Sequence, residues 1–400
     1  MTPGAGIFRT TLPLGFSVGG VNSGVRMYRP DLGMIVSERP CVAAGVFTKS
    51  TCKAAPVLHC QKLLPADNIK AVITNSGEAN AGTGEEGILN NQQMVDEVAR
   101  VLKCSSTQVL SASTGVIGRP LSIDKIKEAI PALCENMTKV AEKFAVAILT
   151  TDLVPKTIHK EVSLSQGVVH ITGICKGSGM IHPNMATMLG YLLTDVVLKK
   201  EEAQVLLREA TDCSFNMVSV DGETSTNDSV FLLANGMTKV SLNTKEDFLL
   251  FKEALFDVAI SLAKSIARDG EGASKLIEVE VLGAEDHAEA IRIAKSIITS
   301  PLIKTAVHGE SPNWGRILAR LGAEQLSEKV LDQCDISMQG IMIFSKGAPL
   351  LNAEMELLKK KLKEDTIHIH IHLHHGEGMA TGWGCDLTEK YVKINAEYLS

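Results

Sequence analysis

Three glycine-rich segments carry the side chains best suited to acyl chemistry. Segment 176–189 leads from Lys176 to Thr187, a hydroxyl residue at the start of an apolar run. A threonine hydroxyl is a weak nucleophile at neutral pH and needs a base nearby. His182 is a candidate partner, but the spacing does not fix the geometry of a dyad. The pattern alone favours a turn followed by a β-branched strand residue.

Two further segments allow a catalytic interpretation and a purely structural one. In 113–118 a predicted strand runs into Thr114 and Gly115, and such a turn exposes N–H groups and a hydroxyl that could stabilise an oxyanion. In 269–273, Glu271 lies between two glycines, where its carboxylate could bind a substrate ammonium. The same glycines also fit the end of a helix. Spacing does not distinguish either site from an ordinary turn.

Segment 367–375 alternates isoleucine or leucine with histidine and contains the run His368–His375. A strand repeats every two residues, so four histidines share one face and the aliphatic side chains the other. Alternating histidines can chelate a metal. No cysteine or carboxylate cluster adjoins the run, so we interpret it as the solvated face of a half-buried strand and predict no metal site.

Segment 82–87 matches the G-x-G-x-x-G pattern of dinucleotide-binding sites. The preceding strand ends near Thr74, which leaves too long a loop, and Glu85 and Glu86 lie where a pyrophosphate would bind. Acidic residues in the first turn of a helix are better explained by the helix dipole. We therefore predict no nucleotide cofactor.

Apolar runs and amphipathic segments predict the elements that must position these residues. Strands are expected at 45–48, 71–74, 109–113, 168–174, 188–197 and 275–282, and helices at 88–103, 124–130, 140–149, 200–212, 246–268 and 288–298. Strands and helices do not alternate strictly along the chain, which favours a layered α/β or α+β fold over a doubly wound sheet. We expect a larger body, 1–283, and a smaller C-terminal α/β domain, 284–400.

Composition narrows the class of protein. The 400 residues carry a formal net charge of −6, and only 4% are aromatic. Such a chain offers little attraction for phosphates and few rings for base stacking, so we expect no nucleic-acid partner. No apolar run approaches 18 residues, and we expect neither a membrane span nor an N-terminal targeting signal. Nine cysteines without a repeating spacing indicate reduced thiols, and we predict a cytoplasmic protein.

Small and polar motifs follow one another along nearly the whole chain. They occupy 74–81, 112–118, 150–156, 176–189, 220–228, 269–273, 300–305, 312–316 and 384–388. Their content and order resemble the ornithine acetyltransferase family, the glutamate N-acetyltransferases of arginine biosynthesis. So many motifs in one order make the resemblance specific.

The resemblance implies an N-terminal-nucleophile-like αββα sandwich made as a precursor that cuts itself. The cut would fall between Ala186 and Thr187 and give chains 1–186 and 187–400. It would free the α-amine of Thr187, a base with an ordinary pKa near 8. In the uncut chain this nitrogen is an amide, so the precursor is expected to be inert.

The same resemblance implies ping-pong acetyl transfer from N2-acetylornithine to glutamate through an ester on Thr187, without a cofactor. Thr114 and Gly115 match the oxyanion hole. The matching substrate contacts are Thr150 or Thr151, Lys176 (suited to an α-carboxylate), Glu271 (suited to the ornithine ammonium), Asn395 and Ser400. The family implies an α2β2 assembly. Acetyl-CoA as a further donor, and a self-processed aminopeptidase or amidase on a related scaffold, stay open.

Overall fold

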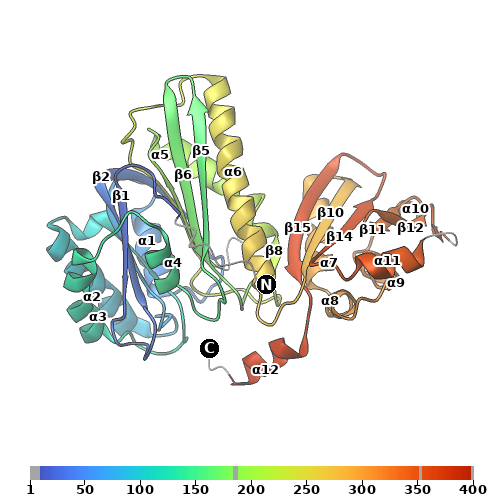
Figure 1. Cartoon of the computed structure of the whole chain (residues 1–400), viewed down its shortest axis with the longest axis horizontal. Coiled ribbons are helices and arrows are strands. Elements are labelled where there is room, and N and C mark those ends of the chain that lie inside the picture. Colours follow the sequence, from blue (N-terminus) through green and yellow to red (C-terminus); the bar gives the residue numbers. More distant parts are fainter. Residues whose placement is uncertain (1–9, 183–187, 351–353, 398–400) are drawn as a thin grey trace, which may run out of the picture.

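The computed structural model describes residues 10–182, 188–350 and 354–397. Its strands form two mixed sheets (Figure 1). The first sheet has eight strands: β1 Phe16–Val21, β2 Leu32–Phe47, β3 Ala66–Asn75, β4 Val109–Ser113, β5 Lys156–Leu164, β6 Gly167–Lys176, β7 Leu189–Thr194 and β9 Ser229–Ala234. Their order is β4-β3-β2-β9-β7-β6-β5, with β1 paired to β2.

The second sheet has seven strands and lies in the C-terminal part of the molecule. They are β8 Val218–Ser219, β10 Leu276–Ala284, β11 Asp335–Met338, β12 Ile341–Ser345, β13 Ala348–Pro349, β14 Thr366–His372 and β15 Gly378–Cys385. Their order is β13-β12-β11-β14-β10-β15-β8.

Helices cover both sheets and join them. Those that precede β10 in the chain are α1 Ala55–Leu63, α2 Gly84–Leu102, α3 Ile123–Glu135, α4 Glu142–Ala147, α5 Lys200–Asp212 and α6 Lys245–Arg268. The others are α7 His287–Thr299, α8 Pro301–His308, α9 Gly315–Ala323, α10 Glu328–Leu331, α11 Met355–Lys361 and α12 Glu389–Glu397. α2 begins with Glu85 and Glu86 in its first turn, as the dipole argument predicts.

The first sheet buries side chains on both faces. Successive residues of a strand point to opposite faces, and neighbours along these strands accordingly belong to different clusters. Tyr191 packs against Phe144 of α4. Its neighbour Leu192 belongs to the same cluster as Leu262 of α6. Strands covered on both faces are apolar throughout, which explains the continuous apolar run of β7.

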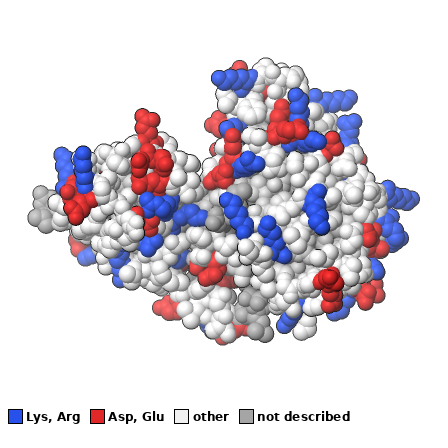
Figure 2. All heavy atoms as spheres, turned by 180° about the vertical axis from the view of Figure 1, so that it is seen from behind, with Lys and Arg blue, Asp and Glu red and all other residues white. Residues whose placement is uncertain are grey.

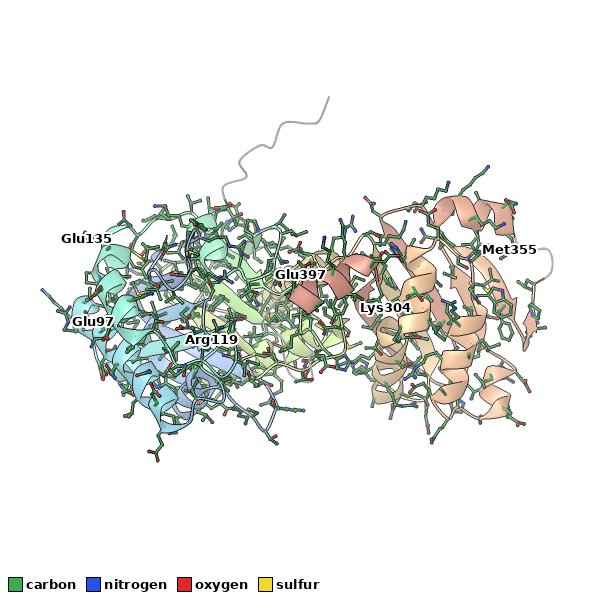
Figure 3. All side chains as sticks on the ribbon, turned by 90° about the horizontal axis from the view of Figure 1, so that it is seen from below. Glu97, Arg119, Glu135, Lys304, Met355 and Glu397 are labelled. Atoms are coloured by element: carbon green, nitrogen blue, oxygen red, sulfur yellow. The ribbon has the colours of Figure 1, made fainter. Side chains whose placement is uncertain are left out.

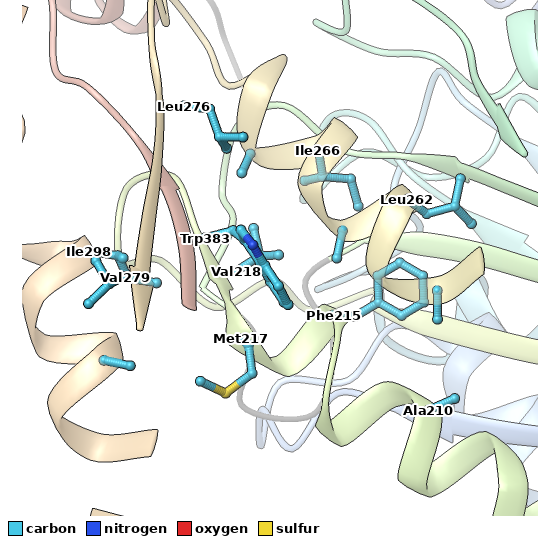
Figure 4. Close-up of a cluster of buried hydrophobic side chains, with 14 of the residues drawn as sticks. Ala210, Phe215, Met217, Val218, Leu262, Ile266, Leu276, Val279, Ile298 and Trp383 are labelled. Atoms are coloured by element: carbon cyan, nitrogen blue, oxygen red, sulfur yellow. The ribbon is translucent and has the colours of Figure 1, made fainter. Parts of the chain in front are cut away.

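One apolar cluster joins the two sheets around α6 (Figure 4). Leu262 and Ile266 of α6 lie near Phe215, Val218 and Trp383, the last from β15 of the second sheet. α6 contacts β5 and β6 of the first sheet and β8 and β15 of the second. The layered α/β class predicted from the sequence is therefore confirmed.

The second sheet begins upstream of the predicted boundary at 283. That position lies in β10, which pairs with β14 and β15. β8, from before α6, adds the edge strand beside β15. A division between α6 and β10 keeps more of this sheet together than a division at 283. The sequence did not indicate this boundary, because periodicity identifies a strand but not the strands that it pairs with.

Charged side chains of both signs are interspersed on the face shown in Figure 2. All nine cysteines are free thiols. Among the described residues, no helix has the length and hydrophobicity needed to cross a membrane.

Candidate active site

A cavity lies where the ends of several elements meet. Its described lining residues are Ala79, Thr114, Gly115, Ile117, Thr150, Thr151, Lys176, Gly179, Met180, Met188, Leu189, Ser225, Thr226, Asn227, Asp228, Glu271 and Asn395. Seven of these are the site residues that the sequence predicts and the structure describes. The other three, Ala186, Thr187 and Ser400, lie outside the described residues. Met188, which is bonded to Thr187 in the chain, lines the cavity and is 3% exposed.

Thr114 and Gly115 form a turn directly after β4. The N–H of Thr114 donates to the carbonyl of Asn75 at 2.9 Å. Gly115 has φ +125°, and a Cβ there would lie 2.4 Å from the carbonyl oxygen of Gly77, so the turn requires glycine. Among the described residues nothing accepts the N–H of Gly115. Gly115 lines the cavity, so the described residues leave this donor open to a ligand there.

Lys176 ends β6 and is buried beside the turn. Its Nζ donates to Oγ1 of Thr114 at 3.2 Å. An ammonium group can only donate, so the hydroxyl accepts here and keeps its own proton for another partner. Burial lowers the pKa of Lys176, and the carboxylate of Asp152 opposes this effect.

A buried ion cluster of Asp152, Lys156 and Asp269 supports the end of β6. Nζ of Lys156 lies 2.7 Å from Asp152 and 2.5 Å from Asp269. Asp152 also accepts the N–H of Gly177 at 2.7 Å. Burial alone would raise the pKa of Asp152, but the ammonium groups of Lys176 and Lys156 outweigh it and lower this pKa to about 2. The cluster ties the start of β5 and the end of α6 to the loop that follows Lys176.

Glu271 presents a carboxylate to the cavity from the loop after α6. Its Oε2 accepts from Nδ2 of Asn395 at 2.8 Å. A Cβ at Gly179 would lie 2.3 Å from the Glu271 carboxylate, so this glycine leaves room for it. Asn395 belongs to α12, which lies between the parts holding the two sheets (Figures 1 and 3). The contact therefore brings a residue from the C-terminal helix to a cavity lined mainly by the first half of the chain.

Thr150 and Thr151 both line the cavity. The N–H of Thr150 donates to Oδ2 of Asp152 at 3.1 Å, and its hydroxyl lies 3.5 Å from the same oxygen. Thr150 is thus attached to the buried ion cluster. The geometry leaves both threonines as candidate substrate contacts.

His182, which the sequence offers as a partner for Thr187, is not among the described lining residues of the cavity. Its Nδ1 lies 3.1 Å from Oγ of Ser219. Burial lowers the pKa of His182 to about 4, so its imidazole is neutral at pH 7.

Asn227 and Asp228 are buried polar residues among the lining residues that had no role in the sequence-based prediction. Nδ2 of Asn227 donates to the carbonyl of Ser113 at 2.8 Å and to that of Ala79, which holds the strand end before Thr114. Asp228 is 2% exposed, and its Oδ2 has no hydrogen-bond partner among the described residues. Burial raises the pKa of Asp228 well above its ordinary value. The only signal in the sequence is the motif that contains both residues, because their partners lie far away in the chain.

The histidine run begins in β14, which ends at His372, and its predicted half-burial is confirmed. Ile367, Ile369, Ile371 and Leu373 are at most 1% exposed, and the histidines point the other way. The expectation that no cysteine or carboxylate cluster adjoins the run is wrong for the carboxylates. Glu278 and Glu280 of β10 and Asp335 of β11 face these histidines, because strand pairing brings them across from distant parts of the chain.

The sequence matches the model of the ArgJ family over residues 17–400. The chain belongs to the ArgJ family. It is similar to the arginine biosynthesis bifunctional protein ArgJ of Dehalococcoides mccartyi, with 45% identity over 97% of this chain and 96% of that protein. The protein of the same name from Bacillus subtilis is 44% identical over 96% of this chain and 95% of its own length. These relatives confirm the family that the motifs predicted.

A solved structure of a relative from Bacillus halodurans also resembles part of the chain. It is the crystal structure of an arginine biosynthesis bifunctional protein ArgJ, 42% identical, with a TM-score of 0.50. The match covers 53% of this chain and 100% of the solved chain. The solved chain therefore corresponds to about half of the ArgJ family sequence described here.

Proposed function

We propose that this protein moves the acetyl group of N2-acetylornithine to glutamate through an ester on Thr187, after it cuts its own chain between Ala186 and Thr187. The observation that carries the proposal is the meeting of the Thr114–Gly115 turn, Lys176 and Glu271 around one cavity beside Met188. Membership of a family whose relatives are named for arginine biosynthesis supports this substrate class.

The first half-reaction needs hydrogen-bond donors for the carbonyl oxygen, on which negative charge develops. The Thr187 hydroxyl attacks the acetyl carbonyl while its proton passes to the α-amine of Thr187. Gly115 N–H and the Thr114 hydroxyl stabilise the carbonyl oxygen in the tetrahedral intermediate, with the charge of Lys176 close by. When the C–N bond breaks, the α-amine returns the proton to the ornithine nitrogen, and an acetyl ester remains on Thr187.

The second half-reaction reverses these roles. The amine of glutamate attacks the ester carbonyl, the C–O bond breaks, and a proton returns to the Thr187 hydroxyl. N-Acetylglutamate leaves, and no cofactor enters the balance. Glu271 is suited to the ammonium end of ornithine, because its buried carboxylate is an acceptor for charged donors. Thr150 or Thr151, Asn395 and Ser400 would complete the substrate contacts.

The cut explains how a threonine inside a chain becomes reactive. Only a terminal Thr187 has a free amine that can act as the base. The half-length chain of the Bacillus halodurans relative supports a protein composed of two shorter chains. We propose that chains 1–186 and 187–400 assemble as α2β2 in the cytoplasm. Because curated relatives are named bifunctional, we also propose acetyl-CoA as a second donor, tested by N-acetylglutamate formation with acetyl-CoA alone.

Intact mass and activity of Thr187 variants test the proposal. The purified wild type should show two chains that together account for the 42.9 kDa sequence, whereas Thr187→Ala should remain one inactive chain. Thr187→Ser keeps a hydroxyl and is the matched control, expected to cut itself and to transfer acetyl groups. A single uncut chain in active wild-type protein would overturn the mechanism.

A self-processed aminopeptidase or amidase would release ornithine by transfer to water. The acetyltransferase should turn over N2-acetylornithine continuously only when glutamate is present, with ornithine and N-acetylglutamate formed in equal amount. Without glutamate, ornithine release should stop once each Thr187 carries an acetyl group. Ornithine release at the same rate without glutamate would favour the hydrolase.

A further inference from the structure

The second sheet sets a carboxylate opposite the histidine strand. β11 runs antiparallel to β14, and their register pairs Asp335 directly with His372. His374 lies two residues beyond the end of β14, where its backbone has φ +51°. The ligand atoms of these three side chains all lie within 4.8 Å of one another. Among the described residues, no other group of three or more such side chains meets this criterion.

Neighbouring groups hold the three side chains in place. Oδ1 of Asp335 accepts from Oγ of Ser345 at 2.6 Å, while Oδ2 lies 2.7 Å from Nε2 of His374. The rings of His372 and His374 have their centroids 3.7 Å apart. A carboxylate oriented through one oxygen, with the other facing imidazoles, is the arrangement that supporting hydrogen bonds give to metal ligands.

A glycine makes room for this arrangement. Gly283 has φ +67°, and a Cβ there would lie 2.7 Å from Cδ2 and 2.9 Å from Nε2 of His372. The chain beyond β14 is held by main-chain bonds, from Leu373 N to Leu282 O and from His375 N to Gly283 O. The backbone that carries both histidines is thus fixed against β10.

We propose that Asp335, His372 and His374 bind a divalent transition-metal ion, Zn²⁺ in the first instance. Two imidazoles and a carboxylate are ligands that Zn²⁺ accepts, with water in the remaining position. Donors at about 2.0–2.2 Å from a tetrahedral ion are about 3.4 Å apart, so small side-chain rotations close the site. The three residues do not line the candidate active-site cavity, and the ion would tie β11 to β14.

The remaining pairs on this face explain why the site falls at one end of the strand. His368 lies 3.3 Å from Glu278, and His370 lies 2.7 Å from Glu280. Each of these pairs would offer a metal ion two ligand side chains, one fewer than the group at Asp335. Glu278 also accepts from the side chains of Lys264 and Trp383. His368 is therefore a matched control on the same strand and the same face.

Equilibrium dialysis of the full-length protein against Zn²⁺, after treatment with EDTA, tests the proposal. The wild type should bind one high-affinity ion per chain, and Co²⁺ at the same site should give the visible absorption of a tetrahedral complex. Asp335→Asn and His372→Ala should each weaken binding at least tenfold, and His368→Ala should not.

Thermal unfolding separates loss of the site from loss of the fold. Without metal, Asp335→Asn should unfold at the wild-type temperature, because asparagine can still accept from Ser345. With Zn²⁺, only the wild type and His368→Ala should become more stable. Equal Zn²⁺ affinity in wild type and Asp335→Asn, or equal loss in His368→Ala, would overturn the assignment.

Discussion

The Thr114 hydroxyl accepts a hydrogen bond from Lys176 and keeps its own proton for a ligand. The same turn offers the N–H of Gly115, which has no acceptor among the described residues. Two donors from adjacent residues, with an ammonium behind one of them, are suited to a carbonyl oxygen that becomes negative. In the proposed reaction this pair acts in the transition state, while Glu271 acts on the bound substrate.

The variant Thr114→Val tests whether Thr114 acts in the transition state and not in substrate binding. Valine has nearly the shape of threonine but lacks the hydroxyl, so we expect kcat to fall about 10²- to 10³-fold with a smaller change in KM. Thr114→Ser retains the hydroxyl and should keep most of the activity. Steady-state kinetics of glutamate-dependent ornithine release measure both variants. A valine variant with the wild-type kcat would remove Thr114 from the oxyanion hole.

Single elements follow the sequence wherever their signals are local. Helices predicted at 200–212 and 246–268 are observed at Lys200–Asp212 and Lys245–Arg268, because each carries its own periodicity, and Thr244 caps the second. The sequence does not predict β9 from periodicity. All six of its residues are buried, so the strand lacks the alternation of polar and apolar residues that marks a half-buried strand. Register is likewise not local, which is why Asp335 opposite His372 could not be predicted.

The site shows the same limit. Motif order places Thr114, Lys176 and Glu271 among the candidates without giving their contacts. Asn227 holds the carbonyl of Ser113 across a separation of 114 residues, and such a bond has no signature in a single sequence. The buried ion cluster is another such case, since it joins the start of β5 to the end of α6.

Among the described residues, Lys156 is the only cation that forms ion pairs in the buried ion cluster, and its removal should destabilise the junction of β5 and α6. Lys156→Met would leave Asp152 and Asp269 buried without their ion-pair partner, with Lys176 as the remaining cation near Asp152, so we expect a loss of about 3–5 kcal/mol in the free energy of unfolding. Lys160→Met is the control from the same strand, because Lys160 pairs with Asp257 at the surface and should matter by about 1 kcal/mol or less. Urea unfolding followed by circular dichroism compares them. Equal effects would show that the cluster contributes no more than a surface pair.

The first sheet contains strands from both sides of the proposed cut, and these strands are interleaved. β7 and β9 would belong to chain 187–400, yet they lie between β2 and β6, which would belong to chain 1–186. β9 pairs with β2, and β7 pairs with β6, so two ladders of backbone hydrogen bonds cross from one chain to the other. Separating the chains would expose the middle of the sheet together with its buried apolar side chains.

This interleaving predicts that the processed protein stays together without a covalent link. With an affinity tag before residue 1, we expect chain 187–400 to remain bound in equal amount through washes with dithiothreitol and about 1 M salt. All nine cysteines are free, so a reductant has no bond to break, and salt at this concentration screens surface charges but not apolar packing. Denaturant should release the chain only as the fold is lost. The uncut Thr187→Ala variant is the control, and its unfolding midpoint in urea should be close to that of the wild type. Release of chain 187–400 by salt or reductant alone would contradict a shared core.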